Sequence, residues 1–173
     1  MIRVGVIGAA GRMGATVCNA VHADSDLELV AAVDPQSPGA TIHGVTIASE
    51  LRALADAKVD VAVDFTVADA ARVSLPWLAM HSMHAVVGTT GFTAGDLESF
   101  KKSFTNSNCL VAANFAIGAV LMMRFAEIAA PFFDTAEIVE IHHDAKADSP
   151  SGTAITTAQR MAAASSSWAQ DPT

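Results

Sequence analysis

The sequence is poor in basic residues and contains no long hydrophobic run. Its 173 residues include 10 Lys and Arg against 18 Asp and Glu, which gives a formal net charge of −8. Because nucleic acids and anionic membrane surfaces are bound by clustered Lys and Arg, this balance argues against both as partners. No apolar stretch is long enough to span a bilayer without interruption by a charge, Gly or Pro. We therefore expect a soluble protein with neither a nucleic-acid nor a membrane partner.

Cysteine is also scarce. Cys18 and Cys109 are isolated and match neither a disulfide framework nor the spacing of a metal cluster, which favours a reducing compartment. A signal peptide is not expected, because the apolar residues 2–7 lead directly into a glycine-rich turn. These absences together predict a cytoplasmic protein.

The sequence does contain enough apolar material for a core, with 51% hydrophobic residues. Short β-rich runs alternate with segments of helical periodicity, which is typical of a parallel sheet covered by helices on both faces. The near-continuous apolar character of the runs fits strands buried on both sides. The predicted strands are 2–7, 27–33, 59–63, 84–87 and 109–112, and the predicted helices are 11–23, 49–57, 67–80 and 93–104. We expect an α/β fold with a Rossmann-like, doubly wound parallel sheet.

The pattern changes after Asn114. Residues 116–130 predict a strongly apolar helix, residues 135–142 a strand, and a polar loop leads to a further helix that begins near Ser151. The Ser-rich tail has no helical or strand period and is expected to fray. We therefore predict two domains, 1–115 and 116–173, of which the second has α+β character.

Three glycines separate the first predicted strand from the first predicted helix. Gly8, Gly11 and Gly14 have the spacing G-x-x-G-x-x-G, and Asp34 ends the second strand about 20 residues further on. Glycines there let backbone N–H groups approach a pyrophosphate at the helix N-terminus, and the acidic residue accepts hydrogen bonds from a ribose. The alternative is a purely structural turn followed by an Asp-Pro loop. The strand–turn–helix context favours a dinucleotide site formed by Gly8, Ala9, Ala10, Gly11, Arg12, Met13 and Asp34.

Asp34 also bears on the choice of dinucleotide. A carboxylate at this position repels the 2′-phosphate of NADPH, and Arg52 is the only Arg or Lys between Asp34 and Lys58. Arg12, in the glycine turn, compensates in part for the carboxylate. We expect NADH to be used at least as well as NADPH.

Three later strand ends carry polar or aromatic residues, and ligands of open α/β sheets bind at the carboxyl ends of the strands. Gly88 and Thr89 can place backbone groups and a hydroxyl beside a ribose or nicotinamide. Phe65 can pack against the cofactor, and Asn114 can contact its carboxamide. Each motif by itself is also ordinary turn chemistry. Since all three lie at one edge of the predicted sheet, the predicted cofactor site also includes Phe65, Gly88, Thr89, Thr90, Ala112, Ala113, Asn114 and Phe115.

The segment from Glu140 to Ala154 combines proton-transfer and anion-binding residues. His142 or His143 can transfer a proton near neutral pH, and Lys146 adds a full positive charge. The helix start at 151–153, Ser-Gly-Thr, offers free N–H groups and the positive end of the helix dipole to a carboxylate. The segment therefore predicts a site for an anionic substrate that exchanges a proton.

Simpler roles are open for the same residues. Paired histidines are common on surfaces, and Ser151 or Thr153 can merely cap a helix after Pro150. A metal site would combine the histidines with Asp144 or Asp148. Because adjacent residues of a strand point to opposite faces, no metal is expected.

These residues resemble one family closely, the 4-hydroxy-tetrahydrodipicolinate reductases, also called dihydrodipicolinate reductases, of the bacterial diaminopimelate and lysine pathway. The most specific stretch, at residues 140–154, reads E-x-H-H-x-x-K-x-D-x-P-S-G-T-A. The resemblance runs from Met1 to about Ala163. Its other matching stretches are 8–14, 64–66, 88–92 and 114–118.

The resemblance implies an oxidoreductase in which NADH or NADPH gives a hydride to the ring of a cyclic unsaturated dicarboxylate, converting 4-hydroxy-tetrahydrodipicolinate to tetrahydrodipicolinate. It implies that His142 is the proton donor and acceptor and that Lys146 is a second donor. The residues implied to hold the substrate carboxylates are His143, Ser151, Gly152 and Thr153.

The resemblance also implies a dinucleotide-binding domain at 1–115 and a partial substrate-binding and catalytic domain at 116–173. An intact family member is expected to form a homotetramer. Family members often carry Pro where Ala113 stands here, a departure that leaves the backbone able to present Asn114.

Members of the resembled family are considerably longer than this chain. We therefore expect a C-terminally truncated reductase with an unpaired sheet edge, and with low solubility or low activity. The alternative, in a different functional class, is a nucleotide-binding fragment without turnover, which would not need His142, Lys146 and the Ser-Gly-Thr helix start together. Another kind of oxidoreductase is disfavoured, because neither Cys18 nor Cys109 lies in the context of a reactive thiol.

Overall fold

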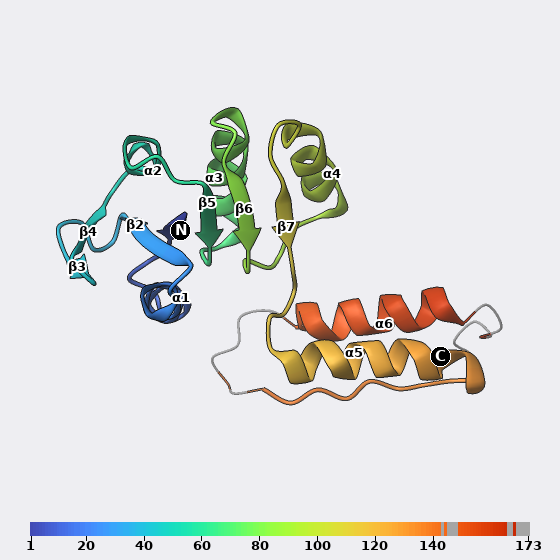
Figure 1. The fold of residues 1–173 in the computed structure, drawn as a ribbon. Coiled ribbons are helices and arrows are strands. Elements are labelled where there is room, and N and C mark those ends of the chain that lie inside the picture. The colour runs from blue at the N-terminus through green and yellow to red at the C-terminus, as the bar shows by residue number, and fades with distance from the viewer. Residues whose placement is uncertain (143, 145–148, 166–167, 169–173) are drawn as a thin grey trace. The chain divides into compact units, whose positions relative to one another are not determined.

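The structure, a computed structural model, describes residues 1–142, 144, 149–165 and 168. The chain divides into two units, Met1–Ala112 and Ala113–Thr173 (Figure 1). The predicted domains 1–115 and 116–173 stay a prediction.

The first unit is built on a seven-stranded sheet with the order β3-β4-β2-β1-β5-β6-β7. All neighbouring strands are parallel except β3 and β4, which form an antiparallel hairpin at one edge. The Rossmann-like α/β fold predicted from the sequence is therefore confirmed. The strands are β1 (Ile2–Ile7), β2 (Leu27–Val33), β3 (Thr41–Ile42), β4 (Val45–Ala48), β5 (Val61–Asp64), β6 (His84–Val87) and β7 (Cys109–Val111).

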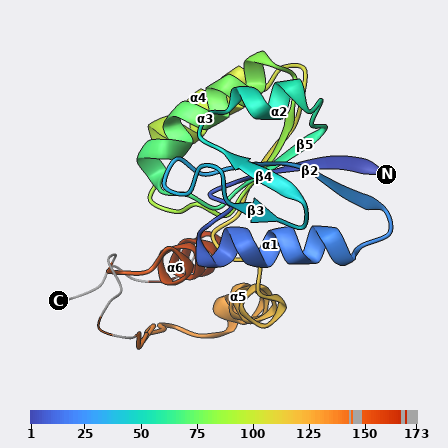
Figure 2. The ribbon, with the colours of Figure 1, turned by 90° about the vertical axis from the view of Figure 1, so that its left-hand side faces the viewer.

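Helices cover both faces of the sheet. Figure 2 shows α1 (Arg12–Ala23) on one face and α2 (Arg52–Asp56), α3 (Ala68–Met80) and α4 (Ala94–Ser103) on the other. Each face has its own apolar core. Cys18 and Val21 of α1 pack with Val6, whereas Leu75 of α3 and Phe100 of α4 belong to the second core. Burial of both faces explains why the strands read as continuous apolar runs.

The strand order places the reversal of winding between β1 and β5. Leaving out the antiparallel β3, the parallel strands follow the chain order 3-2-1-4-5-6, which is the doubly wound order. Val4–Ile7 of β1 pair in register with Val61–Asp64 of β5. The glycine turn after β1 and the loop after β5 therefore leave the sheet side by side, at the position where such folds bind ligands.

The hairpin of β3 and β4 is absent from the sequence-based prediction. Its two-residue turn consists of His43 and Gly44, whose φ angles are +48° and +80°. Positive φ at both positions is the requirement of a type I′ turn, which matches the twist of the flanking strands. Because β3 is only two residues long, it offers no alternating pattern from which to predict it.

The second unit consists, in its described part, of α5 (Ile117–Ala129), the 3₁₀ turn η1 (Ala130–Phe132) and α6 (Gly152–Ala164). Both predicted helices are present, but the predicted strand over residues 135–142 is wrong. The segment contains the β-branched residues that favour a strand. A strand also needs a partner for its backbone N–H and C=O groups, and no described segment of this unit pairs with these residues.

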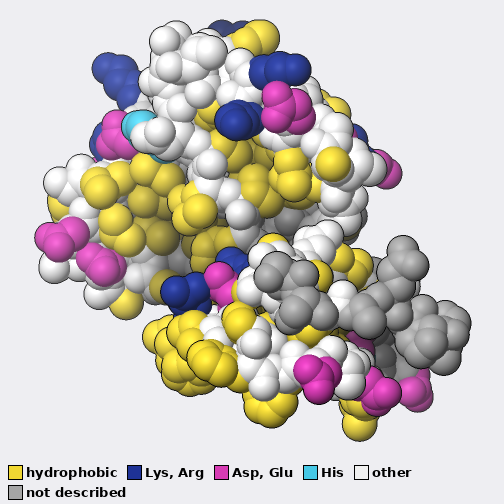
Figure 3. Space-filling view, turned by 90° about the vertical axis from the view of Figure 1, so that its right-hand side faces the viewer, with side chains coloured by type: hydrophobic (Ala, Val, Ile, Leu, Met, Phe, Trp, Pro, Cys, Tyr) yellow, Lys and Arg dark blue, Asp and Glu magenta, His cyan; other side chains and the backbone are white. Residues whose placement is uncertain are grey.

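Several large apolar side chains of the second unit face solvent. Phe125 of α5 is 63% exposed, and Val139 and Ile141 are 84% and 90% exposed. Figure 3 shows hydrophobic side chains, in yellow, over much of this unit, in the lower part of the view. Clustered apolar side chains on a surface often mark a contact with another chain or segment. Among the described residues, no helix is both long enough and apolar enough to cross a membrane.

One ion pair joins α3 to α4 in the first unit. The Arg72 guanidinium donates to both carboxylate oxygens of Asp96, from Nε and Nη2 at 3.0 Å each. Asp96 also forms the capping box of α4 with Thr93. These hydrogen bonds, first from Arg72 and then from Thr93, hold the pKa of the Asp96 carboxyl well below its usual range. Charge and cap therefore fix the start of α4 next to the loop at 88–92.

Replacement of Asp96 by Asn is expected to lower the thermal unfolding midpoint at neutral pH. A depressed carboxyl pKa contributes stability above the pKa of the unfolded chain, about 3.9, and loses it as the pH falls. The difference in midpoint between the wild type and Asp96→Asn should therefore shrink as the pH is lowered from about 6 to about 2. This range extends about two pH units above and below the carboxyl pKa of the unfolded chain. Circular dichroism melts measure it. Glu98→Gln, which breaks only the exposed pair with Lys102, serves as the control. A difference that is constant over this range would contradict the prediction.

Candidate functional site

The glycine turn links β1 to α1 at the reversal point of the sheet. Gly8 donates from its N–H to the carbonyl of Val33 at 2.8 Å, and Gly11 donates to the Gly8 carbonyl at 3.0 Å. Gly11 is the N-cap residue of α1, and Arg12 and Met13 begin the helix. The first N–H groups of a helix have no partner within it, so this exposed end can receive an anion.

Two of the three glycines are required by close approach. Gly8 has a φ of +78°, and a Cβ at Gly14 would lie only 1.9 Å from the Gly8 carbonyl oxygen. A side chain at Gly14 would push α1 away from the turn, and one at Gly8 would also be strained. The start of α1 therefore lies directly against the end of β1. Such a cradle fits a pyrophosphate, which needs backbone N–H groups rather than side chains around it.

Asp34 is only 8% exposed and is held against this turn. Its Oδ2 accepts the Ala10 N–H and its Oδ1 accepts the Gln36 N–H, both at 3.0 Å. The carboxylate therefore fastens the glycine turn to the loop after β2. Each oxygen keeps a further lone pair, so contact with a ribose stays a prediction for Asp34.

The loops after β5 and β6 meet beside the glycine turn. A Cβ at Gly88 would lie 2.0 Å from the Phe65 ring, so the two loops are in contact. Thr89 is 3% exposed, and its hydroxyl donates to Asp64 Oδ1 at 3.1 Å and accepts the Thr66 N–H at 3.0 Å. Because this hydroxyl is already bonded within the protein, a contact between it and a ribose is disfavoured. The prediction that Thr89 contacts the cofactor therefore applies to its backbone. The hydroxyl of Thr90 is on an exposed residue.

Asn114 lies at the start of the second unit. Its Oδ1 accepts the Ala116 N–H at 2.8 Å, and its Nδ2 donates to Thr153 Oγ1 at 3.1 Å. The side chain thus ties the approach to α5 to the first turn of α6. The predicted contact of the residues Ala112–Phe115 with a nicotinamide stays a prediction, and the bonds of Asn114 leave that role to its backbone.

The predicted anion site at the start of α6 has a well-defined cap. Ser151 is 5% exposed, its Oγ accepts the Ala154 N–H at 3.1 Å, and its N–H donates to Glu140 Oε1 at 2.8 Å. A cap of this kind stabilises a helix by about 1 kcal/mol. Because the Ser151 groups are used within the protein, the accessible N–H groups for a carboxylate are those of Gly152 and Thr153.

His142 lies next to this cap. Its Nδ1 is 3.7 Å from Glu140 Oε2, and its side chain is 40% exposed, so the ring lies beside a carboxylate and remains accessible. His143 and Lys146 lie outside the described residues. So does Asp148, whereas Asp144 is exposed. Among the described residues, no group of three or more His, Cys, Asp or Glu side chains could hold a metal ion.

Neither cysteine is a candidate nucleophile. Burial raises the pKa of the Cys18 thiol to about 11, and burial together with the Asp64 charge raises that of Cys109 to about 11. Both therefore remain protonated thiols at neutral pH, as the sequence context suggested.

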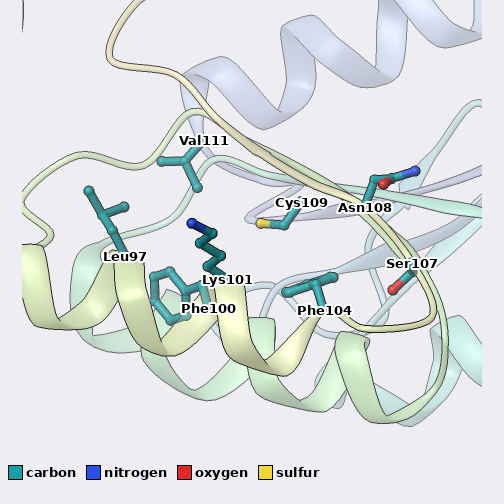
Figure 4. A pocket seen from close by; sticks show the side chains of 8 residues that line it. All are labelled: Leu97, Phe100, Lys101, Phe104, Ser107, Asn108, Cys109 and Val111. Carbon is teal, nitrogen blue, oxygen red and sulfur yellow. The ribbon is translucent and has the colours of Figure 1, made fainter.

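Cys109 lines a pocket of about 240 Å³ between α4 and β7. Figure 4 shows the Cys109 sulfur pointing into the pocket, with the Lys101 amine to one side of it, near Val111. The pocket shares no lining residue with the predicted cofactor or substrate site. Its lining residues are Leu97, Phe100, Lys101, Phe104, Ser107, Asn108, Cys109 and Val111.

Two supporting carboxylates have no assigned role in the sequence-based prediction. Glu140 and His142 are two residues apart in an extended segment, and this spacing places both side chains on one side. That signal was available in the E-x-H pattern. Asp64 is fully buried, and its partners Thr66, Ser74 and Thr89 lie up to 25 positions away, so the sequence offers no local signal for their contact.

Comparison with known proteins gives a consistent result over both units. Residues 2–115 match the family described as "Dihydrodipicolinate reductase, N-terminus", and residues 118–171 match "Dihydrodipicolinate reductase, C-terminus". The 4-hydroxy-tetrahydrodipicolinate reductase of Cutibacterium acnes is 48% identical over 95% of this chain and 62% of its own length. That of Mycobacterium ulcerans is 45% identical over 99% of this chain and 66% of its own length. The chain thus spans just under two thirds of the length of these relatives.

A solved structure with the same family name is also similar to this chain. Dihydrodipicolinate reductase from Paenisporosarcina sp. TG-14, with dipicolinate bound, has a TM-score of 0.81 and 37% sequence identity. The similarity covers 99% of this chain and 69% of that chain.

The glycine cradle can be tested with one added methyl group. Gly14→Ala is expected to weaken NADH binding at least about tenfold, because the Cβ collides with the Gly8 carbonyl and displaces the helix N-terminus from the pyrophosphate. Titration of NADH fluorescence measures the dissociation constant.

Gly95→Ala is the matched control. A Cβ at Gly95 has only the Thr93 Oγ1 nearby, at 3.7 Å, and the position lies within helix α4. Alanine is the better helix former, so this variant should bind NADH as the wild type does. Equal NADH affinity of Gly14→Ala and the wild type would contradict the proposed cradle.

Proposed function

Because the chain belongs to the dihydrodipicolinate reductase family, we propose that it takes part in the reduction of 4-hydroxy-tetrahydrodipicolinate to tetrahydrodipicolinate. In this reaction the substrate, NAD(P)H and a proton give tetrahydrodipicolinate, NAD(P)⁺ and water. The observation that carries the proposal is the presence of both halves of the chemistry in one chain. The first unit has a dinucleotide cradle, and the second has a histidine beside an anion-binding helix start.

The first unit is assigned to the dinucleotide. The supporting evidence is the exposed N-terminus of α1, the close contact of Gly8 with Gly14, and the position of Asp34 beside the turn. When bound, the reduced nicotinamide supplies the hydride. The chain's own residues hold the pyrophosphate at the start of α1 and place the loops at 65 and 88–90 beside the turn.

The second unit is assigned to the dicarboxylate. The Paenisporosarcina relative is described with dipicolinate bound, a cyclic dicarboxylate. In this chain the N–H groups of Gly152 and Thr153 lie at the positive end of α6, where a carboxylate is favoured. We assign the further carboxylate contacts to His143 and Lys146, which lie outside the described residues.

His142 is assigned to proton transfer at the substrate ring. The side chain is 40% exposed, and its Nδ1 lies 3.7 Å from Glu140 Oε2, so we assign Nε2 to the substrate. Glu140 also accepts the Ser151 N–H, so one carboxylate lies beside both the histidine and the helix start. Lys146 is assigned as the second proton donor. Acid–base help of this kind is worth about 10²–10⁴-fold in rate.

The proposal extends to the setting of the reaction. We infer that an intact protein of this family works as a homotetramer in the cytoplasm. The apolar surface of the second unit supports the assembly into an oligomer. The scattered, protonated cysteines support the cytoplasmic location.

The first test is the oxidation of NADH in the presence of freshly generated 4-hydroxy-tetrahydrodipicolinate. The wild-type chain is expected to oxidise NADH only when this substrate is present. His142→Ala should lower kcat by at least about 10²-fold, because the substrate loses its proton donor. The absorbance of the reduced nicotinamide measures both.

His81→Ala is the control for removal of an imidazole. His81 ends α3, where its ring stacks on Trp77, and it belongs to no predicted site. Its kcat should equal that of the wild type. NADH binding without turnover in the wild-type chain would favour a non-catalytic nucleotide-binding fragment instead. An unchanged kcat in His142→Ala would remove this residue from the chemistry.

The second test compares NADH with NADPH. We expect kcat/KM with NADH to be at least equal to that with NADPH, because the Asp34 carboxylate repels a 2′-phosphate. Arg12→Gln should lower kcat/KM for NADPH more than for NADH, since Arg12 is the exposed cation of the turn. A preference of the wild type for NADPH of more than about tenfold would show that this interpretation of Asp34 is wrong.

A further inference from the structure

A carboxylate is buried at the carboxyl edge of the sheet, where we propose that the dinucleotide binds. Asp64, the last residue of β5, is 0% exposed. Its Oδ1 accepts the Thr66 hydroxyl at 2.7 Å, the Thr66 N–H at 3.0 Å and the Thr89 hydroxyl at 3.1 Å. Its Oδ2 accepts the Ser74 hydroxyl at 2.6 Å. Within the first unit, all of whose residues are described, these donors are hydroxyls and one backbone N–H rather than a cation.

Removing a carboxylate from water costs free energy, so its hydrogen bonds must be made in the folded state. A charged group removed from water is tolerated only when hydrogen bonds replace the lost hydration. Each donor is therefore held in position by the need to satisfy the carboxylate. The two oxygens serve different parts of the protein. Oδ1 binds the loops after β5 and β6, and Oδ2 binds the middle of α3.

The loop-side bonds control the position of Phe65. Thr66 and Thr89 are joined directly, because the Thr89 hydroxyl accepts the Thr66 N–H at 3.0 Å. Phe65 precedes Thr66 and is packed between two glycines of the proposed site. A Cβ at Gly88 would lie 2.0 Å from the Phe65 ring, and one at Gly8 would lie 2.8 Å from the Phe65 carbonyl oxygen. A small shift of the loop after β5 would therefore alter both neighbouring loops.

We propose that Asp64 is a positioning residue for dinucleotide binding, whose buried carboxylate fixes the loops after β5 and β6 against the glycine turn. The inference rests on the proposed function of the first unit. Asp64 itself does not touch the cofactor, because it has no exposed surface. It acts through Thr66 and Thr89, which set the place of Phe65 and of the Gly88 backbone.

Two variants of matched chemistry test this inference. Thr66→Val and Ser74→Ala each remove one hydroxyl from the same carboxylate, the first on the loop side and the second on the helix side. The NADH dissociation constant is measured for each folded variant by fluorescence titration, well below its unfolding midpoint. Thr66→Val should bind NADH about tenfold more weakly, which is the scale of one hydrogen bond to a charged group, and Ser74→Ala should bind it as the wild type does.

Thermal unfolding separates positioning from mere stability. Both variants should unfold at lower temperature than the wild type, because each loses a hydrogen bond of a buried carboxylate. Asp64→Asn provides the rescue, because its amide oxygen can still accept from the loop hydroxyls while its NH₂ group donates to Ser74 Oγ. Its NADH dissociation constant should stay within about threefold of the wild type, whereas Asp64→Ala should lose at least as much affinity as Thr66→Val.

The outcomes are distinguishable from a failure of the proposed function. Absence of NADH binding by the wild-type chain would overturn the proposed function and this inference together. NADH binding by the wild type, with equal dissociation constants for Thr66→Val and Ser74→Ala, would overturn only the role of Asp64. If Asp64→Ala does not fold, the comparison of Thr66→Val with Ser74→Ala still decides.

Discussion

The contact between the Gly8 carbonyl and the backbone at Gly14 is the constraint on which the arrangement of the first unit depends. With no Cβ at either position, α1 starts directly at the end of β1, and its N–H groups open at the carboxyl edge of the sheet. The parallel pairing of β1 with β5 then brings Phe65 to the same place. An anion site of this kind needs no basic side chain. That is consistent with an acidic protein for which we propose a phosphate-containing cofactor.

The second unit follows the same principle with a different cap. The Ser151 side chain and the Glu140 carboxylate satisfy groups at the start of α6, and the N–H groups of Gly152 and Thr153 remain for a ligand. Glu140 connects this helix start to His142. One acidic residue therefore lies beside both the proposed carboxylate-binding helix start and the proposed proton-transfer histidine. Asn114 adds a second tie, because it bonds to Thr153 in the same turn.

Sequence reasoning predicts the parts of the fold that come from local pattern. The strands at 2–7, 27–33 and 84–87 are where they were expected, because buried parallel strands are continuous apolar runs. The hairpin at His43–Gly44 escapes prediction, since two-residue strands have no period. The strand over 135–142 fails for the opposite reason: its composition favours a strand, but pairing is a non-local property. The glycine turn and Ser151 could be assigned because their chemistry is contained within a few consecutive residues.

The supporting residues of the site cannot be predicted from local sequence patterns, because they are far apart in the sequence and come into contact only in the folded chain. In the sequence, Asp64 is simply the polar residue at the end of an apolar run, and Ser74 is one small residue within an apolar helix. Their contact at 2.6 Å depends on how α3 packs on the sheet. The same holds for Thr89, whose hydroxyl faces Asp64 rather than solvent. Residues that contact ligand through their backbone can be recognised from glycine spacing. Residues that hold those backbones in place are recognised only when buried polar groups are matched with their partners, because an unmatched buried carboxylate would unfold the edge it occupies.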